Sequence, residues 1–344
     1  MNILLNGVGR IGKAILRIAN SSTSLNIVAI NELNSNIDNI AYSINYDSTY
    51  GTFEDKFKVS QNEIKNQTNT IKILNHNSLL DIDFKALNID IVIDASGANL
   101  DASKLQELPL KAILLTHPKK DADINIILGV NANDLNTKTH KVISTSSCNA
   151  TALLPLLKLI DEKKQILCGD ITTIHPLLNH QKVLDGSCLA SKNRDVECNF
   201  EFGRSSTQNI IPSKTTTIEA CSYLNKNINS SIFSSSSLRV PTDTVGVINV
   251  ALNVKEDCTK EEIINICKEY EENQKFKVFL NNDEALVSSD FKKSEYTTIL
   301  DHRFTDVKQA KMIKLVVWYD NEWGYASKVV DILKLYVKIS NNNK

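Results

Sequence analysis

Three glycines follow the first apolar segment of the chain at the spacing Gly-X-Gly-X-X-Gly, from Gly7 to Gly12. Residues 3–5 before them are apolar and residues 13–19 after them have helical spacing, so the glycines stand between an expected strand and an expected helix. Glycines in this context permit a tight turn and let a pyrophosphate approach the backbone at the positive helix N-terminus. They predict a dinucleotide site, although a purely structural turn is the alternative for six residues alone.

An acidic residue, Glu32, follows at the end of the next expected strand. In dinucleotide-binding folds a carboxylate at this position accepts a hydrogen bond from a ribose 2′-hydroxyl. The same carboxylate would repel the 2′-phosphate of NADP. The pattern therefore predicts NAD as the cofactor.

Short apolar segments alternate with helical patterns through the first part of the chain, which predicts a parallel sheet covered on both faces. From about Asp170 the apolar segments become longer and more alternating, which predicts a mixed or antiparallel sheet. Helices are expected at about 260–271 and at 325–339, and the serine run Ser234–Ser237 is expected to be a surface turn. The expected strands are residues 3–5, 27–30, 91–93, 112–115, 124–127, 142–143, 171–174, 237–240, 245–254 and 312–319.

These patterns predict an α/β protein with two domains, as the length of 344 residues also suggests. A Rossmann-type dinucleotide-binding domain is expected over residues 1–147. An α+β catalytic domain with a mixed or antiparallel sheet is expected over residues 148–324.

The composition excludes several classes of function. Lys and Arg number 39 against 40 Asp and Glu, for a formal charge of −1, so no nucleic-acid partner is expected. No apolar run approaches the roughly 18 residues of a membrane span, and no secretory signal follows Met1, so we expect a cytoplasmic location. The seven cysteines form no CxxC pair, so neither a metal site nor a disulfide framework is expected.

One cysteine, Cys148, stands after Ser147 at the expected start of an apolar helix. A helix N-terminus stabilises a thiolate and offers backbone donors to an oxyanion, whereas an inert buried cysteine is our interpretation of the other six. His175 ends a strand further along the chain. A Cys–His pair can act as nucleophile and base, although a structural buried histidine is the alternative. Together with a dinucleotide fold, the pair predicts covalent oxidation of an aldehyde.

The chain also carries an ordered series of motifs: Asn6–Gly12, Ala29–Glu32, Tyr46–Gly51, Asp94–Gly97, Ser147–Cys148, Thr172–His175, Gln208–Pro212, Leu238–Thr242 and Trp318–Tyr325. In identity and spacing they resemble the glyceraldehyde-3-phosphate dehydrogenases, a family that includes erythrose-4-phosphate dehydrogenases. The resemblance extends from residue 2 to about residue 340.

The resemblance implies that Cys148 is the nucleophile and His175 the base, and that Arg239 meets a phosphate. Asn321 would hold the nicotinamide carboxamide, with Tyr325 bracing that region. From residue type alone, a surface strand is the alternative for Arg239, and a turn and a helix start are the alternatives for the other two. Further phosphate-site residues would be Ser147, Asn149, Thr215 and Thr216, and further cofactor-binding residues Gly7, Gly9, Arg10, Ile11, Gly12, Glu32, Ser96 and Gly97.

The resemblance further implies a homotetramer, with the segment Gln181–Pro212 reaching toward a neighbouring cofactor. It implies that the last helix, 325–344, completes the cofactor domain. The implied activity is NAD-dependent oxidation of glyceraldehyde 3-phosphate in glycolysis. The alternative is oxidation of erythrose 4-phosphate with hydrolytic release of the acid.

Two anion sites depart from the family pattern. Asn149 replaces a threonine that helps to bind inorganic phosphate, and Thr216 replaces a glycine. Leu178 stands where a threonine usually meets the substrate phosphate, and Arg194 and Arg204 stand in place of two paired arginines. Use of inorganic phosphate is therefore open, as is the choice between an acyl phosphate and a free acid as product.

Two other classes of protein remain as alternatives. The altered anion sites suit a cofactor-binding regulatory protein without turnover. A 2-hydroxy-acid dehydrogenase would also bind NAD but would need no thiol.

Overall fold

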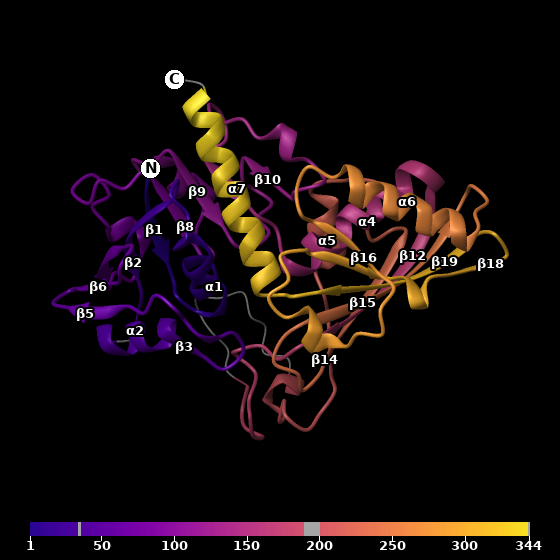
Figure 1. The fold of residues 1–344 in the computed structure, drawn as a ribbon, viewed down its shortest axis with the longest axis horizontal. Coiled ribbons are helices and arrows are strands. Elements are labelled where there is room, and N and C mark those ends of the chain that lie inside the picture. The colour runs from indigo at the N-terminus through magenta and orange to yellow at the C-terminus, as the bar shows by residue number, and fades with distance from the viewer. Residues whose placement is uncertain (34–35, 189–199, 343–344) are drawn as a thin grey trace. The chain divides into compact units, whose positions relative to one another are not determined.

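The computed structural model describes residues 1–33, 36–188 and 200–342. The chain forms two compact units (Figure 1). Unit 1 comprises Met1–Ile126, Ala132–Ser146 and Ala326–Lys344, and unit 2 comprises Ile127–Asn131 and Ser147–Tyr325.

Unit 1 contains a nine-stranded sheet with the order β10-β11-β9-β8-β1-β2-β7-β6-β5. The strands from β10 to β7 pair in parallel, and β6 and β5 add an antiparallel edge. The strands are β1 (Asn2–Asn6), β2 (Asn26–Asn31), β5 (Lys58–Ser60), β6 (Glu63–Lys65), β7 (Thr70–Leu74), β8 (Ile91–Asp94), β9 (Ala112–Leu115), β10 (Ile124–Asn125) and β11 (Val142–Ser144), with a separate hairpin of β3 (Tyr46–Asp47) and β4 (Gly51–Thr52). The predicted parallel sheet is confirmed, although β10 is shorter than expected and the edge strands were not predicted.

The parallel strands are apolar because both faces of the sheet are covered. Ile3, Leu4 and Leu5 of β1 are fully buried, as are all four residues of β9. Such strands lose the polar alternation of a half-exposed sheet. The helices of this unit are α1 (Arg10–Ala19), α2 (Ile37–Asn45) and α3 (Ala102–Glu107).

The C-terminal helix α7 (Trp323–Asn342) begins in unit 2 and belongs to unit 1 from Ala326 onward. Within unit 1 the hydroxyl of Tyr336 donates to the carbonyl of Lys111, at 2.9 Å. The predicted helix is confirmed. No helix among the described residues is long and apolar enough to cross a membrane.

Unit 2 contains an eight-stranded sheet with the order β13-β14-β12-β15-β19-β17-β16, in which β18 also pairs with β19. Strand β12 is parallel to β14 and antiparallel to β15, so the predicted mixed sheet is confirmed. The strands are β12 (Ile166–His175), β13 (Ile211–Ser213), β14 (Phe233–Arg239), β15 (Gly246–Val254), β16 (Phe279–Asn282), β17 (Thr298–Asp301), β18 (Asp306–Lys308) and β19 (Met312–Tyr319), and the helices are α4 (Cys148–Lys164), α5 (Thr217–Ser222) and α6 (Lys260–Asn273).

The prediction of a surface turn at Ser234–Ser237 is wrong, because these serines form the middle of β14. The strand lies between β12 and β13, which pair with its backbone on both sides. Ser237 faces inward and is 1% exposed. Backbone pairing and alternation of burial outweigh the low strand preference of the serines.

Candidate active site

The predicted thiol and imidazole lie together in unit 2. Cys148 is the first residue of α4, and the hydroxyl of Ser147 caps this helix by accepting from the backbone N–H of Ala150, at 3.2 Å. His175 is the last residue of β12. The Sγ of Cys148 lies 3.9 Å from the Nε2 of His175. The helix start and the strand end thus bring together residues that are distant in the sequence.

The tautomer of His175 follows from the hydrogen bond made by its Nδ1. Its Nδ1 lies 2.9 Å from the carbonyl oxygen of Pro176, which only accepts hydrogen bonds. Nδ1 therefore carries the proton, and the lone pair of Nε2 faces the sulfur. Burial, aided by the charge of Arg239, lowers the pKa of His175 to about 3. The imidazole is neutral and can accept a proton.

The environment of Cys148 favours the thiol over the thiolate. Burial raises the pKa of the Cys148 thiol to about 11. Arg239 and hydrogen bonds from the backbone N–H groups of Asn149 and Cys148 act in the opposite direction, and Glu322 adds to the rise. The backbone N–H groups at the helix N-terminus do favour the thiolate, as predicted, but desolvation is the larger effect and sets the direction of the shift.

Arg239 supplies a positive charge beside this pair. It ends β14, and the parallel register places it next to His175 on β12. Its Nε and Nη1 are buried and have no hydrogen-bond partner among the described residues. Guanidinium groups bind phosphates and carboxylates through such N–H groups. This side chain is suited to an anionic group on a substrate.

Two of the predicted phosphate residues, Asn149 and Thr215, bond to side chains that were not predicted for this site. The Nδ2 of Asn149 donates to the hydroxyl of Thr217 at 3.2 Å, and its Oδ1 accepts from the hydroxyl of Tyr319 at 2.6 Å. The hydroxyls of Thr215 and Thr217 lie 2.6 Å apart. Thr216 precedes α5 without a side-chain cap. Their role in phosphate binding stays a prediction.

Neither Tyr319 nor Thr217 was predicted to take part in the site. Tyr319 lies within the motif Trp318–Tyr325, and its place on the buried face of β19 is a signal that could have identified it. Thr217 begins α5, a helix of only six residues, and its polar sequence neighbours give no pattern that singles it out. Its contact with Asn149 joins residues 68 positions apart, which local patterns do not reveal.

Two other residues of the expected anion sites, Leu178 and Arg204, lie in the segment between β12 and β13. The backbone N–H of Leu178 donates to the Oε1 of Gln181, at 2.7 Å. Arg204 forms an exposed ion pair with Asp185, at 3.1 Å. Arg194, and with it part of the segment expected to reach a neighbouring cofactor, lies outside the described residues.

Asn321 is held in a fixed orientation before α7. Its Oδ1 accepts from the backbone N–H of Val245 and from the hydroxyl of Thr244, each at 3.1 Å. Val245 has a φ of 68°, which β-branched residues rarely adopt. Tyr325 is 3% exposed in the first turn of the helix. The bonds to Oδ1 leave the Nδ2 of Asn321 as the group for a ligand, as its predicted role requires.

The glycine loop of unit 1 fits a dinucleotide. Gly7 has a φ of +89°, and a Cβ there would lie 2.8 Å from the Cα of Ser96. A Cβ on Gly12 would lie 2.0 Å from the carbonyl oxygen of Gly7. The loop after β1 therefore packs tightly against the loop after β8, which contains Gly97. Gly9 ends the loop with open space around its Cβ position, and α1 begins directly after it with Arg10 and Ile11.

Glu32 lies at the end of β2 and contacts this loop. Its Oε2 accepts from the backbone N–H of Val8 at 2.6 Å, and its Oε1 accepts from that of Leu33 at 3.1 Å. Strand β1 lies between β2 and β8, at the change of strand order where doubly wound sheets bind dinucleotides. Each carboxylate oxygen can accept a further bond, so the residues present fit a ribose hydroxyl.

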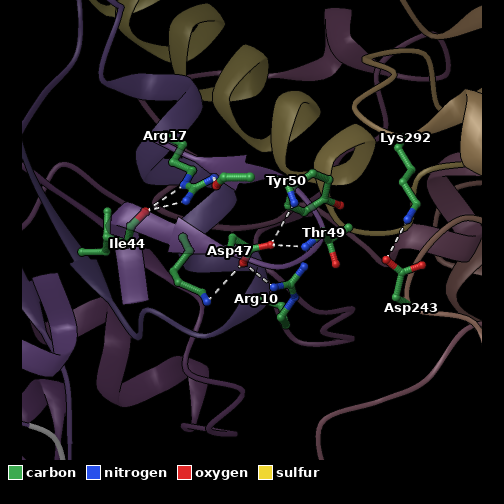
Figure 2. Close-up of polar contacts among 10 residues, drawn as sticks. Arg10, Arg17, Ile44, Asp47, Thr49, Tyr50, Asp243 and Lys292 are labelled. Atoms are coloured by element: carbon green, nitrogen blue, oxygen red, sulfur yellow. Dashed lines mark hydrogen bonds and ion pairs between the residues drawn. The ribbon is translucent and has the colours of Figure 1, made fainter. Parts of the chain in front are cut away.

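Arg10 contacts protein as well as the expected cofactor position. Figure 2 shows its guanidinium bound to the carboxylate of Asp47, which also lies 3.4 Å from the Nζ of Lys13. The second carboxylate oxygen accepts from the backbone N–H groups of Thr49 and Tyr50, each at 3.0 Å. Asp47 thus connects the start of α1 to the turn between β3 and β4.

Two of the cysteines differ from the prediction that all six others are inert and buried. Cys168 is exposed, and Cys188 is disulfide-bonded. Among the described residues, no group of three or more His, Cys, Asp or Glu side chains could hold a metal ion.

The glycine loop, Glu32 and the parallel sheet define an NAD-binding dehydrogenase fold, and the second unit supplies a thiol and a base. The family model for the NAD-binding domain of glyceraldehyde 3-phosphate dehydrogenase matches residues 1–102, and the model for its C-terminal domain matches residues 147–321. The chain belongs to the glyceraldehyde-3-phosphate dehydrogenase family, and it is an oxidoreductase with NAD as its cofactor.

The curated relatives are similar over nearly the whole chain. Glyceraldehyde-3-phosphate dehydrogenase 2 of Bacillus subtilis is 29% identical, over 97% of this chain and 96% of its own length. The enzyme of the same name from Staphylococcus epidermidis is 32% identical, over 96% and 94%. The chloroplastic glyceraldehyde-3-phosphate dehydrogenase A of Chlamydomonas reinhardtii is 33% identical, over 98% and 89%.

Proposed function

We propose that the protein oxidises a phosphorylated sugar aldehyde through a covalent bond to Cys148, and that glyceraldehyde 3-phosphate is its substrate. The observation that carries the proposal is the 3.9 Å approach of Sγ to the deprotonated Nε2 of His175. The names of the relatives support the choice of aldehyde. A regulatory protein without turnover would have no need of this pair.

The chemistry follows from the two side chains. The sulfur attacks the aldehyde carbon as its proton passes to Nε2 of His175, and the imidazolium returns a proton to the carbonyl oxygen, giving a thiohemiacetal. His175 then removes the hydroxyl proton as the hydride departs, which leaves a thioester on Cys148. Bound NAD supplies the acceptor for that hydride. Positioned acid–base catalysis of this kind contributes roughly 10²–10⁴-fold.

Arg239 would bind a phosphate of the substrate or the incoming inorganic phosphate. Its unpaired N–H groups beside His175 support this role. We also propose a homotetramer and a cytoplasmic, glycolytic role, which rest on the family and on the composition. Light scattering of the purified protein tests the tetramer.

A second candidate is an erythrose-4-phosphate dehydrogenase that releases the acid by hydrolysis. Two observations favour it: Leu178, at the expected substrate-phosphate site, offers no side-chain donor, and Asn149 donates an amide N–H to the hydroxyl of Thr217 while its Oδ1 accepts from Tyr319. Fewer free donors remain for an incoming phosphate, so water would resolve the thioester.

The test measures steady-state NADH formation with each aldehyde, in the presence and absence of inorganic phosphate. A higher kcat/KM for glyceraldehyde 3-phosphate supports the proposed substrate, and a higher value for erythrose 4-phosphate supports the second candidate. Absence of an NADH burst with both aldehydes would contradict both and favour a binding protein. Activity that survives alkylation of Cys148 would favour a 2-hydroxy-acid dehydrogenase.

A further inference from the structure

Asn149 lies between the sulfur of Cys148 and the hydroxyl of Tyr319. Its Oδ1 accepts from the Cys148 thiol at 3.5 Å and from the Tyr319 hydroxyl at 2.6 Å. Tyr319 is 1% exposed, so its hydroxyl has little access to water. One amide oxygen therefore receives both of these protons.

Two acceptors compete for the single thiol proton. Oδ1 of Asn149 lies 3.5 Å from the sulfur, and Nε2 of His175 lies 3.9 Å from it. The amide is held from its other end, because Nδ2 donates to the hydroxyl of Thr217 at 3.2 Å. Rotating the amide to present its N–H groups to the sulfur would break this bond and the bond from Tyr319.

We propose that Asn149 is a positioning residue that keeps Cys148 in its neutral thiol form in the ligand-free enzyme, by accepting the S–H proton and by holding the Tyr319 hydroxyl away from the sulfur. The importance of this for turnover rests on the proposed role of Cys148 as nucleophile. Ionisation of the thiol would leave a negative sulfur against the negative end of the amide dipole. The Tyr319 hydroxyl already donates its proton to Oδ1, so it offers no hydrogen bond to a thiolate.

The charged and titratable groups around the sulfur come from several elements. Arg239 on β14 favours the thiolate, and Glu322, which follows β19, disfavours it. His175 on β12 is neutral, and Tyr319 on β19 is a protonated phenol whose pKa burial raises well above its usual value. Asn149 is uncharged, so its replacement changes the hydrogen bonds of the sulfur without adding a charge to this set.

Asn149→Thr tests the inference, because a threonine hydroxyl can donate to sulfur and cannot hold Tyr319 as the amide does. The rate of alkylation of Cys148 by iodoacetamide is measured by peptide mass spectrometry between about pH 6 and 11. We expect the pH midpoint to fall by about one unit or more, which means about tenfold faster alkylation at neutral pH. Adding Tyr319→Phe should reverse part of this gain, while Tyr319→Phe alone should change the rate little.

Two controls separate this effect from a general loosening of the structure. The exposed thiol of Cys168 reports reagent reactivity in the same sample and should be unchanged. Thr151→Ala removes a buried hydroxyl from the same helix, with no contact to the sulfur, and should leave the midpoint of Cys148 in place. Asn149→Ser, which also lacks the amide, replaces Asn149→Thr if that variant unfolds.

If the pH midpoint of Cys148 alkylation is unchanged or higher in both Asn149→Thr and Asn149→Ser, the inference is overturned. The amide would then stabilise the thiolate or have no effect on it. The alkylation rates need no substrate or NAD. They therefore test the role of Asn149 independently of the proposed function. The proposed function fails if Cys148→Ser retains activity.

Discussion

Asp47 binds the guanidinium of Arg10, the first residue of the helix that follows the glycine loop (Figure 2). Arg10 and Lys13 place two positive charges in the first turn of α1, where the helix dipole disfavours them. The carboxylate of Asp47 compensates for both. Because Asp47 is 5% exposed, water screens this ion pair only weakly.

This contact predicts a loss of stability in acid. Burial alone would raise the pKa of Asp47, but the N–H of Tyr50 and the charge of Arg10 outweigh it and lower the pKa from 3.8 to about 2. The contribution is present above about pH 4 and is lost as the pH falls toward 2, since protons then bind the unfolded chain first. Asp47→Asn should lower the free energy of unfolding by about 2 kcal/mol at pH 7. It should also make the free energy of unfolding depend less on pH between about 2 and 4.

Urea unfolding between about pH 2 and 7 measures this effect. Asp243→Asn is the matched control, because Asp243 forms an exposed ion pair with Lys292, at 2.7 Å, and such pairs contribute about 0–1 kcal/mol (Figure 2). Equal losses in the two variants would contradict the role of Asp47.

Local patterns predicted the elements but not the contacts between distant residues. The apolar strands and the helix that starts at Cys148 follow from periodicity. Gly7 identifies the glycine loop, and Glu32 identifies the strand end that contacts it. Asp47 has its partner 37 residues away, and nothing in its own segment shows that partner. The stabilisation of the thiolate by the helix N-terminus was predicted, but the larger opposing effect of burial was not, because burial by the surrounding side chains is a property of the folded unit.

The nucleophile gives a direct prediction. Cys148→Ser should leave folding and NAD binding near the wild-type level and lower aldehyde oxidation by orders of magnitude, since a serine hydroxyl is hardly ionised at neutral pH. NADH formation and melting temperature are the measurements. Cys168→Ser, at the exposed cysteine, is the control and should retain activity. If the activity of Cys148→Ser is within a few-fold of wild type, Cys148 is not the nucleophile.

The base should act as a neutral imidazole across the physiological range. Since burial and Arg239 lower the pKa of His175 to about 3, kcat/KM should show no fall on the acid side due to His175 between about pH 5 and 8. His175→Asn keeps a donor for the carbonyl of Pro176 and removes the base, so it should lower kcat by roughly 10²–10⁴-fold. If His175→Asn has a near-normal kcat, another residue is the base.

Glu32 should make NAD strongly preferred over NADP. Its carboxylate lies against the glycine loop, so a 2′-phosphate placed there would meet a negative charge. Glu32→Gln keeps the shape and removes the charge, and should raise the NADP-to-NAD ratio of kcat/KM about tenfold, or ~1.4 kcal/mol. Glu63→Gln, on strand β6 between β7 and β5, should not change the ratio. Equal use of the two cofactors by the wild type would refute the prediction.

The last prediction concerns the fate of the thioester. Asn149 and Thr215 are both expected at phosphate sites, but an amide N–H of Asn149 donates to the hydroxyl of Thr217, and the hydroxyl of Thr215 lies 2.6 Å from the same group. Each lost bond to a charged group is worth about 1.5–3 kcal/mol, so losing two would weaken phosphate binding by roughly 10²–10⁴-fold. We expect a high KM for inorganic phosphate and a measurable release of free acid by water.

Product analysis in the presence and absence of inorganic phosphate decides between the two routes. Asn149→Thr should lower the KM for phosphate and raise the share of acyl phosphate among the products. Thr151→Ala, on the same helix, should change neither quantity. The unpaired N–H groups of Arg239 act in the opposite direction, because they offer the phosphate a buried cation. If NADH formation stops without phosphate and acyl phosphate is the sole product, Arg239 outweighs the lost donors and the hydrolytic route is excluded.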